Sequence, residues 1–189
     1  MIAGLAATLA TAGITVFAVT IHHPVGTGLA SRGAPPWARP ADTAAGVRLA
    51  GLRMSTAAGA VTRYDLHLDV FVNGRRVPVP ANLGFDRRTG ETAALRTRDS
   101  SGVVQVESNA QDPRYTLGQL FDEWQVPLSP TRIGGLRAGR RTSLAVYVNG
   151  THVHGDPRRV ALEPQQEIAV EFGTGPFDAP AGYAFPPAE

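Results

Sequence analysis

The sequence predicts a β-rich α+β domain that follows one N-terminal transmembrane helix. Two observations predict the domain: a Val-Asn-Gly hairpin pattern occurs twice, and one amphipathic helix stands between the two copies. An uncharged apolar run at the N-terminus predicts the transmembrane helix. Of the 189 residues, 43% are hydrophobic and 18% are charged, as in a globular protein, and the 21 Gly and 15 Pro favour turns over long helices.

Residues 1–21 are expected to hold the chain in a membrane. From Ile2 to Ile21 there is no charged side chain, and a helix of this length spans about 30 Å, the thickness of a bilayer core. The run is longer than the apolar core of a signal peptide and lacks a clear cleavage site, which favours an uncleaved anchor over a cleaved signal. Arg32 and Arg39 follow it and no basic residue precedes it, so flanking charge alone does not set the orientation.

Residues 22–62 are rich in Pro, Gly and Ala and are expected to form a partly extended spacer. Within this spacer, Val47 to Leu52 is a candidate edge strand. The globular domain is expected over residues 63–173, and residues 174–189 have no periodicity and are expected to form an irregular tail.

Two hairpins are the main structural prediction for the domain. The segments from Leu68 to Val77 and from Leu144 to Val153 both fit L-x-V-[FY]-V-N-G-x-x-V. Asn-Gly supplies the positive φ angles of a type I′ turn, and the flanking β-branched and aromatic residues alternate as in a half-buried strand. Further strands are expected over residues 102–107, 159–162 and 167–172.

One short helix is expected between the hairpins. Thr116 and Gln119 have the spacing of a capping box, and Pro127 follows where the helix must stop. Apolar residues at helical spacing predict a face that packs on the core: Leu117, Leu120, Phe121 and Trp124. The order of elements resembles the β-grasp fold of ubiquitin-like sulfur carriers, at the level of fold alone. A β-sandwich of immunoglobulin or cupredoxin type is the alternative.

Composition excludes several classes of function. All 18 basic residues are Arg, against 16 acidic residues, and the formal net charge is +2. Residues 1–60 carry a net charge of +3 and the remaining residues a net charge of −1, so the domain is nearly neutral and lacks the charge of a nucleic-acid binder. The absence of Cys rules out disulfides, thiolate metal sites and cysteine nucleophiles. No G-x-S-x-G, phosphate-loop or dinucleotide motif occurs, so we expect neither catalysis nor a cofactor.

Histidines are the first candidates for a binding site. His152 and His154 form an H-x-H pair on one face of a strand, which is a weak metal-binding signal. His67 alternates with Asp65 and Asp69, so the three side chains share a strand face. That row is either a set of ligands or the solvated face of an amphipathic strand, and the second interpretation is favoured.

A basic stretch follows the helix and contains Arg132, Arg137, Arg140 and Arg141 without an intervening acidic residue. Its position in a glycine-containing loop favours an ordinary solvated surface. Contact with lipid headgroups or with an acidic partner is the alternative.

Several segments resemble an uncharacterised family of exported or membrane-anchored bacterial proteins: LHLDVFVNGRRVPVPANLGF, LRTRDSSGVVQVES, YTLGQLFDEW, LAVYVNG and GDPRRVAL. The resemblance covers residues 64–172 and implies an extracytoplasmic domain. The family pattern has several His before the first hairpin, an H-T-H-D segment and a further His, a set that resembles a divalent-metal or copper site. In this chain only His67 remains before the hairpin, with Arg63 and Asp65 in place of the others.

The other family histidines are also replaced. The H-T-H-D segment reads Arg96-Thr97-Arg98-Asp99, and the later His is Gln105. Arginine is always charged and cannot bind a metal cation, so the resemblance implies that the family site is lost here. Two arginines could instead favour an anion, with Asp99 orienting the pair. The candidate binding residues are His67, Asp65, Arg96, Arg98 and Asp99.

These observations predict a membrane-tethered, extracytoplasmic binding or accessory domain without catalytic activity. Its expected location is the cell membrane, crossed once, and its expected partners are the membrane and either a protein or a small anion, with no nucleic acid. The alternative is a copper- or zinc-handling protein that uses His67, His152 and His154.

Overall fold

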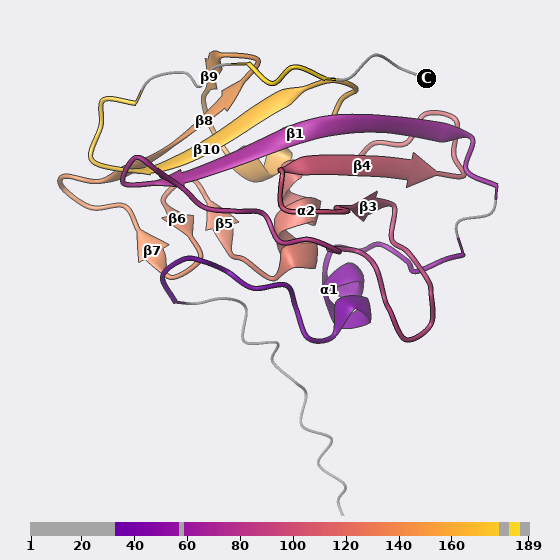
Figure 1. The fold of residues 1–189 in the computed structure, drawn as a ribbon. Coiled ribbons are helices and arrows are strands. Elements are labelled where there is room, and N and C mark those ends of the chain that lie inside the picture. The colour runs from indigo at the N-terminus through magenta and orange to yellow at the C-terminus, as the bar shows by residue number, and fades with distance from the viewer. Residues whose placement is uncertain (1–32, 57–58, 178–181, 186–189) are drawn as a thin grey trace, which may run out of the picture.

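The computed structural model describes residues 33–56, 59–177 and 182–185. These residues form two β-sheets and two α-helices, which confirms the prediction of a β-rich α+β domain (Figure 1). Within the described ranges, no helix has the length and apolar character needed to cross a membrane. The predicted anchor over residues 1–21 lies outside them.

The larger sheet has seven strands, in the order β3-β4-β1-β10-β8-β9, with β2 paired to β1. The first and last strands of the domain, β1 and β10, run parallel at its centre, and the other pairs are antiparallel. The strands are β1 (Thr62–Val72), β2 (Arg75–Arg76), β3 (Leu95–Arg96), β4 (Val103–Ser108), β8 (Ser143–Val148), β9 (Thr151–Val153) and β10 (Glu167–Gly173). A small second sheet contains β5 (Leu128–Ser129), β6 (Arg132–Ile133) and β7 (Leu136–Arg137).

Both predicted hairpins are present. Asn73 and Gly74 connect β1 to β2, and Asn149 and Gly150 connect β8 to β9. All four residues have positive φ, between 49° and 76°, as a type I′ turn requires. The Asn-Gly pattern therefore identified the turns from local backbone chemistry alone.

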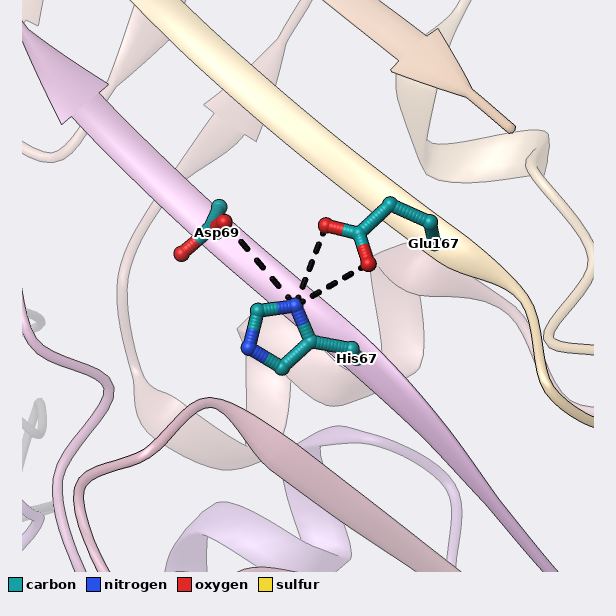
Figure 2. A group of neighbouring side chains, drawn as sticks. All are labelled: His67, Asp69 and Glu167. Carbon is teal, nitrogen blue, oxygen red and sulfur yellow. Dashed lines mark hydrogen bonds and ion pairs between the residues drawn. The ribbon is translucent and has the colours of Figure 1, made fainter. Parts of the chain in front are cut away.

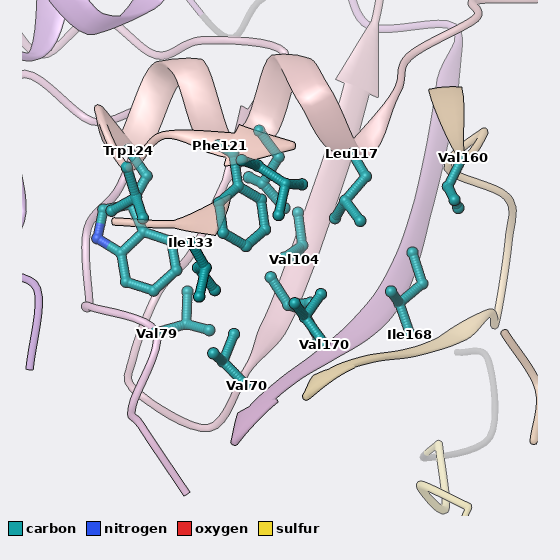
Figure 3. Close-up of a cluster of buried hydrophobic side chains, with 14 of the residues drawn as sticks. Val70, Val79, Val104, Leu117, Phe121, Trp124, Ile133, Val160, Ile168 and Val170 are labelled. Carbon is teal, nitrogen blue, oxygen red and sulfur yellow. The ribbon is translucent and has the colours of Figure 1, made fainter. Parts of the chain in front are cut away.

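The predicted helix is α2 (Leu117–Trp124), and Thr116 and Gln119 form the capping box at its start. Its apolar face packs on one face of the large sheet, where Leu117, Phe121 and Trp124 meet valines of the central strands (Figure 3). These three side chains are fully buried. The burial follows from the apolar spacing in the sequence.

The strand expected over residues 159–162 is wrong: Arg159 ends a turn of 3₁₀ helix, η1 (Pro157–Arg159), and no strand follows it there. Asp156 caps this turn, because its side chain accepts a hydrogen bond from the backbone N–H of Arg158. The chain then runs antiparallel to the residues before α2, with only an isolated bridge between Thr116 and Ala161.

The described part of the expected spacer, from residue 33 onward, is folded onto the domain. It contains α1 (Thr43–Leu49), which is capped by Asp42 and packs against α2. Trp37 and Val47 are buried in the core. The edge strand expected from Val47 to Leu52 is wrong, since these residues end α1 and turn away from it.

Gly46 provides a test of this packing. A Cβ atom at Gly46 would lie 2.3 Å from the backbone oxygen of Glu123 in α2. In an isolated helix, Gly→Ala is worth about 1 kcal/mol of stability, but here α1 would have to move away from α2. We therefore expect Gly46→Ala to lower the free energy of unfolding in urea by about 1–3 kcal/mol. Ala44→Gly in the same helix is the control, with a loss of about 1 kcal/mol from propensity alone. A Gly46→Ala variant more stable than the wild type would contradict the close contact.

Candidate functional site

A buried polar cluster lies on the two central strands of the large sheet. His67 is on β1, Asp69 is two residues further along the same face, and Glu167 is the register partner of His67 on β10. All three are buried, with 3%, 9% and 7% of their surface exposed. Figure 2 shows both carboxylates directed toward one nitrogen of the imidazole ring.

The imidazole of His67 has a hydrogen-bonding partner at each nitrogen. Nδ1 lies 3.0 Å and 3.2 Å from the two carboxylate oxygens of Glu167 and 3.9 Å from Oδ2 of Asp69. Nε2 lies 3.0 Å from the backbone oxygen of Ser101. The ring is therefore held in one orientation by groups from β1, β10 and the turn before β4.

Two further residues enclose the cluster. The Nε–H of Arg76 donates to Oδ1 of Asp69 at 2.6 Å. The ring of Tyr183 stacks on that of His67, with centroids 4.0 Å apart and planes inclined by 9°, and its backbone N–H donates to Oε2 of Glu167 at 3.0 Å. This part of the C-terminal tail thus lies over the cluster.

The solvated-face interpretation of the Asp65-His67-Asp69 row is wrong for His67 and Asp69, because both side chains are buried and Tyr183 stacks on His67. Asp65 is partly exposed, and its backbone oxygen accepts a hydrogen bond from Gln165. Sequence reasoning did not include Glu167 in the site. Its only signal was its place at the start of the last expected strand.

Arg96, on β3, and Arg98, just after it, are separated from the strand of His67 by β4. Arg96 donates to Glu107 and to Gln105, and the Nε–H of Arg98 donates to the same Gln105 side chain at 2.7 Å. Asp99 does not orient the two arginines: its Oδ1 accepts the backbone N–H of Ser101 at 2.8 Å. Hydrogen bonds from Ser101 lower the pKa of Asp99. The predicted anion site is thus a pair of arginines, of which Arg96 is ion-paired to Glu107.

The remaining histidines are far from this cluster in the sheet. His152 and His154 are exposed near β9, with ring centroids 4.6 Å apart, and His152 also contacts Tyr147. Strands β10 and β8 lie between β9 and β1, the strand of His67. The structure therefore does not bring His67, His152 and His154 into one site.

A second feature is a groove of about 480 Å³ beside the C-terminal end of α2. Asp122 of α2 forms two hydrogen bonds with the guanidinium of Arg158, at 2.9 Å and 2.6 Å. The Nε–H of Arg132 donates to the backbone oxygen of Gly134 at 2.7 Å. The groove is lined by Leu49, Phe121, Asp122, Gln125, Val126, Pro127, Leu128, Ser129, Arg132, Arg137 and Arg158.

The basic stretch predicted from the sequence is thus divided. Arg132 and Arg137 line the groove, whereas Arg140 and Arg141 are exposed and do not line it. Arg158, which sequence reasoning did not select, joins the first two because η1 packs against α2.

Comparisons with known proteins give no match: no family model, curated protein or solved structure is significantly similar to this chain. The resemblance to a family of exported proteins therefore stays a prediction. The function has to be inferred from the geometry of the two sites.

Proposed function

We propose that this chain is a membrane-tethered, extracytoplasmic binding domain without catalytic activity, and that its groove beside α2 binds an acidic segment of a partner protein. One observation carries the proposal. The groove combines three arginines with an apolar lining, and the only acidic side chain among its lining residues is Asp122.

Charge and shape favour a protein segment as the occupant. Asp122 neutralises Arg158 through their paired hydrogen bonds, which leaves Arg132 and Arg137 as an excess of positive charge in the groove. Arginine beside apolar surface is typical of protein interfaces. A hollow of about 480 Å³ fits protruding side chains better than it fits the flat surface of a bilayer.

The rim of the groove also offers apolar surface. Leu49, at the end of α1, is 62% exposed and is one of two large hydrophobic side chains exposed among the described residues. A partner that carries both a carboxylate and an aliphatic side chain would use the arginines and Leu49 together. The uncharged run over residues 2–21 supports the tether, and the family resemblance supports the extracytoplasmic side.

The fold itself supports a finer assignment, of β-grasp type. The parallel pair β1 and β10 is central, with β4 beside β1 and the β8–β9 hairpin beside β10. Helix α2 connects the two halves and covers one face of the sheet. The sandwich alternative has less support, because the second sheet in the described ranges has strands of only two residues.

A charge-reversal experiment tests the proposed groove. We expect the purified full-length chain in detergent to bind a fluorescent peptide of alternating Glu and Leu, and Arg132→Glu with Arg137→Glu to weaken binding at least about 10-fold, which corresponds to about 1.4 kcal/mol. Arg140→Glu with Arg141→Glu makes the same charge change outside the groove and should leave the affinity unchanged. Fluorescence anisotropy measures both.

Two results would contradict the groove as a protein-binding site. One is equal weakening by the control pair, since the effect would then come from overall charge. The other is binding to anionic phosphatidylglycerol vesicles without binding to the peptide, which would identify lipid as the ligand.

The alternative of a copper- or zinc-handling protein built on His67, His152 and His154 has less support. His67 is on β1, whereas His152 is on β9 and His154 follows it, and two other strands lie between β1 and β9 in the sheet. A metal site on this chain would need a different set of ligands.

A further inference from the structure

We propose that His67, Asp69 and Glu167 form a binding site for one divalent transition-metal ion of the zinc type. The ligand set differs from the three histidines expected from the sequence. It also shares no residue with the groove proposed to bind a partner, so the two proposals stand or fall separately.

The ligand atoms have suitable spacing. One atom from each of the three residues lies within 4.8 Å of the others. Nδ1 of His67 is 3.0 Å from Oε1 of Glu167 and 3.9 Å from Oδ2 of Asp69. Ligands bound at about 2.0–2.2 Å around a tetrahedral zinc ion are about 3.4 Å apart. Rotation of the side-chain torsions would bring the three atoms to this spacing, because all of them already lie within 4.8 Å of one another.

Each ligand is already held by a second group on its far side. Nε2 of His67 faces the Ser101 carbonyl at 3.0 Å, Oδ1 of Asp69 accepts from Arg76, and Oε2 of Glu167 accepts from the backbone N–H of Tyr183. Metal-binding histidines almost always donate their other N–H to a carbonyl or carboxylate, and metal-binding carboxylates are hydrogen-bonded in turn. The remaining atoms, Nδ1 of His67, Oδ2 of Asp69 and Oε1 of Glu167, are therefore the ones available to bind a metal ion.

The charge of the cluster is compatible with a bound cation. The cluster contains two buried carboxylates and one guanidinium, that of Arg76, so a second positive charge comes either from an imidazole that carries N–H on both nitrogens, each of which faces an oxygen atom, or from a bound cation. An uncompensated buried charge is costly. A divalent ion bound to neutral His67 supplies positive charge at the place where both carboxylates point. One nitrogen and carboxylate oxygens are ligands that zinc accepts.

The position in the fold also fits a metal site. His67 and Glu167 are paired in register on the two central strands, so their separation is fixed by backbone hydrogen bonds. Three protein ligands leave one coordination position for water or another ligand. The ring of Tyr183 covers His67 on one side of the site.

Zinc titration of the full-length chain in detergent tests the site. After removal of metals with a chelator, we expect one Zn²⁺ bound per chain, and Glu167→Gln to weaken the affinity by at least about 100-fold. His152→Ala with His154→Ala removes the exposed histidine pair and should leave that affinity unchanged. Equilibrium dialysis with metal analysis gives both the stoichiometry and the affinity, and circular dichroism checks that the variants are folded.

X-ray absorption at the zinc edge tests the site even if Glu167→Gln fails to fold, because this measurement is made on the wild-type protein. One imidazole ligand per zinc is expected, with the remaining ligands oxygen. Two imidazoles would assign the ion to a site that contains other histidines of the chain and overturn the proposal. It would also be overturned by a wild type that binds no stoichiometric zinc, or by undiminished binding in a folded Glu167→Gln variant.

Discussion

Trp124→Ala is expected to lower the free energy of unfolding by about 3–5 kcal/mol, the range for truncating a large buried aromatic side chain. Trp124 is fully buried at the end of α2 and contacts Phe121, with ring centroids 5.6 Å apart. Its indole N–H donates to the backbone oxygen of Trp37, so truncation also leaves that buried oxygen without its donor. Urea denaturation followed by circular dichroism measures the loss.

A second variant, at Trp37, tests whether residues before the expected domain boundary at residue 63 belong to the core. The rings of Trp37 and Trp124 meet edge to face, 6.0 Å apart and inclined by 83°. A double-mutant cycle with Trp37→Ala should give a coupling energy of about 0.5–1.5 kcal/mol. Leu49→Ala removes an exposed side chain and is the control, with little change expected. A coupling near zero would place Trp37 outside the core in solution.

The elements that could be predicted from the sequence are those specified by neighbouring residues. Asn73-Gly74 and Asn149-Gly150 determine their turns through their own backbone preferences. Thr116 satisfies the free backbone N–H of Gln119 three residues later, so the start of α2 was also visible. The composition of residues 33–62 was misleading, because Ala and Gly suit a spacer but also suit α1, where small residues allow close contact with α2.

The candidate site depended on contacts between distant parts of the chain. Glu167 meets His67 because β10 adds to the sheet parallel to β1 in one particular register. That register follows from packing of the complete core, and no short pattern encodes it. Tyr183 lies in a stretch without periodicity, so its stacking on His67 gave no sequence signal. The two-residue repeat of a strand was enough to predict that His67 and Asp69 share one face. Predicting that both are buried would have required knowing that Glu167 and Tyr183 lie beside them in the fold.

Glu123 is the least expected residue in the core. It lies on α2 between Asp122, which is ion-paired at the surface, and the buried Trp124. Its side chain is 1% exposed, and neither carboxylate oxygen has a hydrogen-bond partner within the described part of the chain. Burial raises the pKa of this carboxyl well above its ordinary value of 4.5. The folded protein therefore holds Glu123 in its neutral form at a pH where the unfolded chain is ionised.

This difference makes stability fall as the pH rises. Below pH 4.5, Glu123 is protonated in both states and has no effect. Above it, the unfolded chain releases the proton and the folded protein keeps it, so the free energy of unfolding decreases by about 1.4 kcal/mol per pH unit until the raised pKa is reached. Glu123→Gln keeps the shape but cannot ionise. Subtracting its urea-unfolding curve against pH from that of the wild type isolates the contribution of this carboxyl from those of all other groups.

Glu123→Met tests the same site from the opposite direction. Methionine has a similar volume and no polar atom that needs a hydrogen bond, so the variant should be more stable than Glu123→Gln at every pH, by about 1–3 kcal/mol. It should exceed the wild type by a margin that widens from pH 5 to pH 8, because only the wild type has a proton to lose on unfolding. A constant difference in stability between Glu123→Met and the wild type over this range would mean that Glu123 is ionised in the folded protein and has a partner. The prediction of a buried neutral carboxyl would then be wrong.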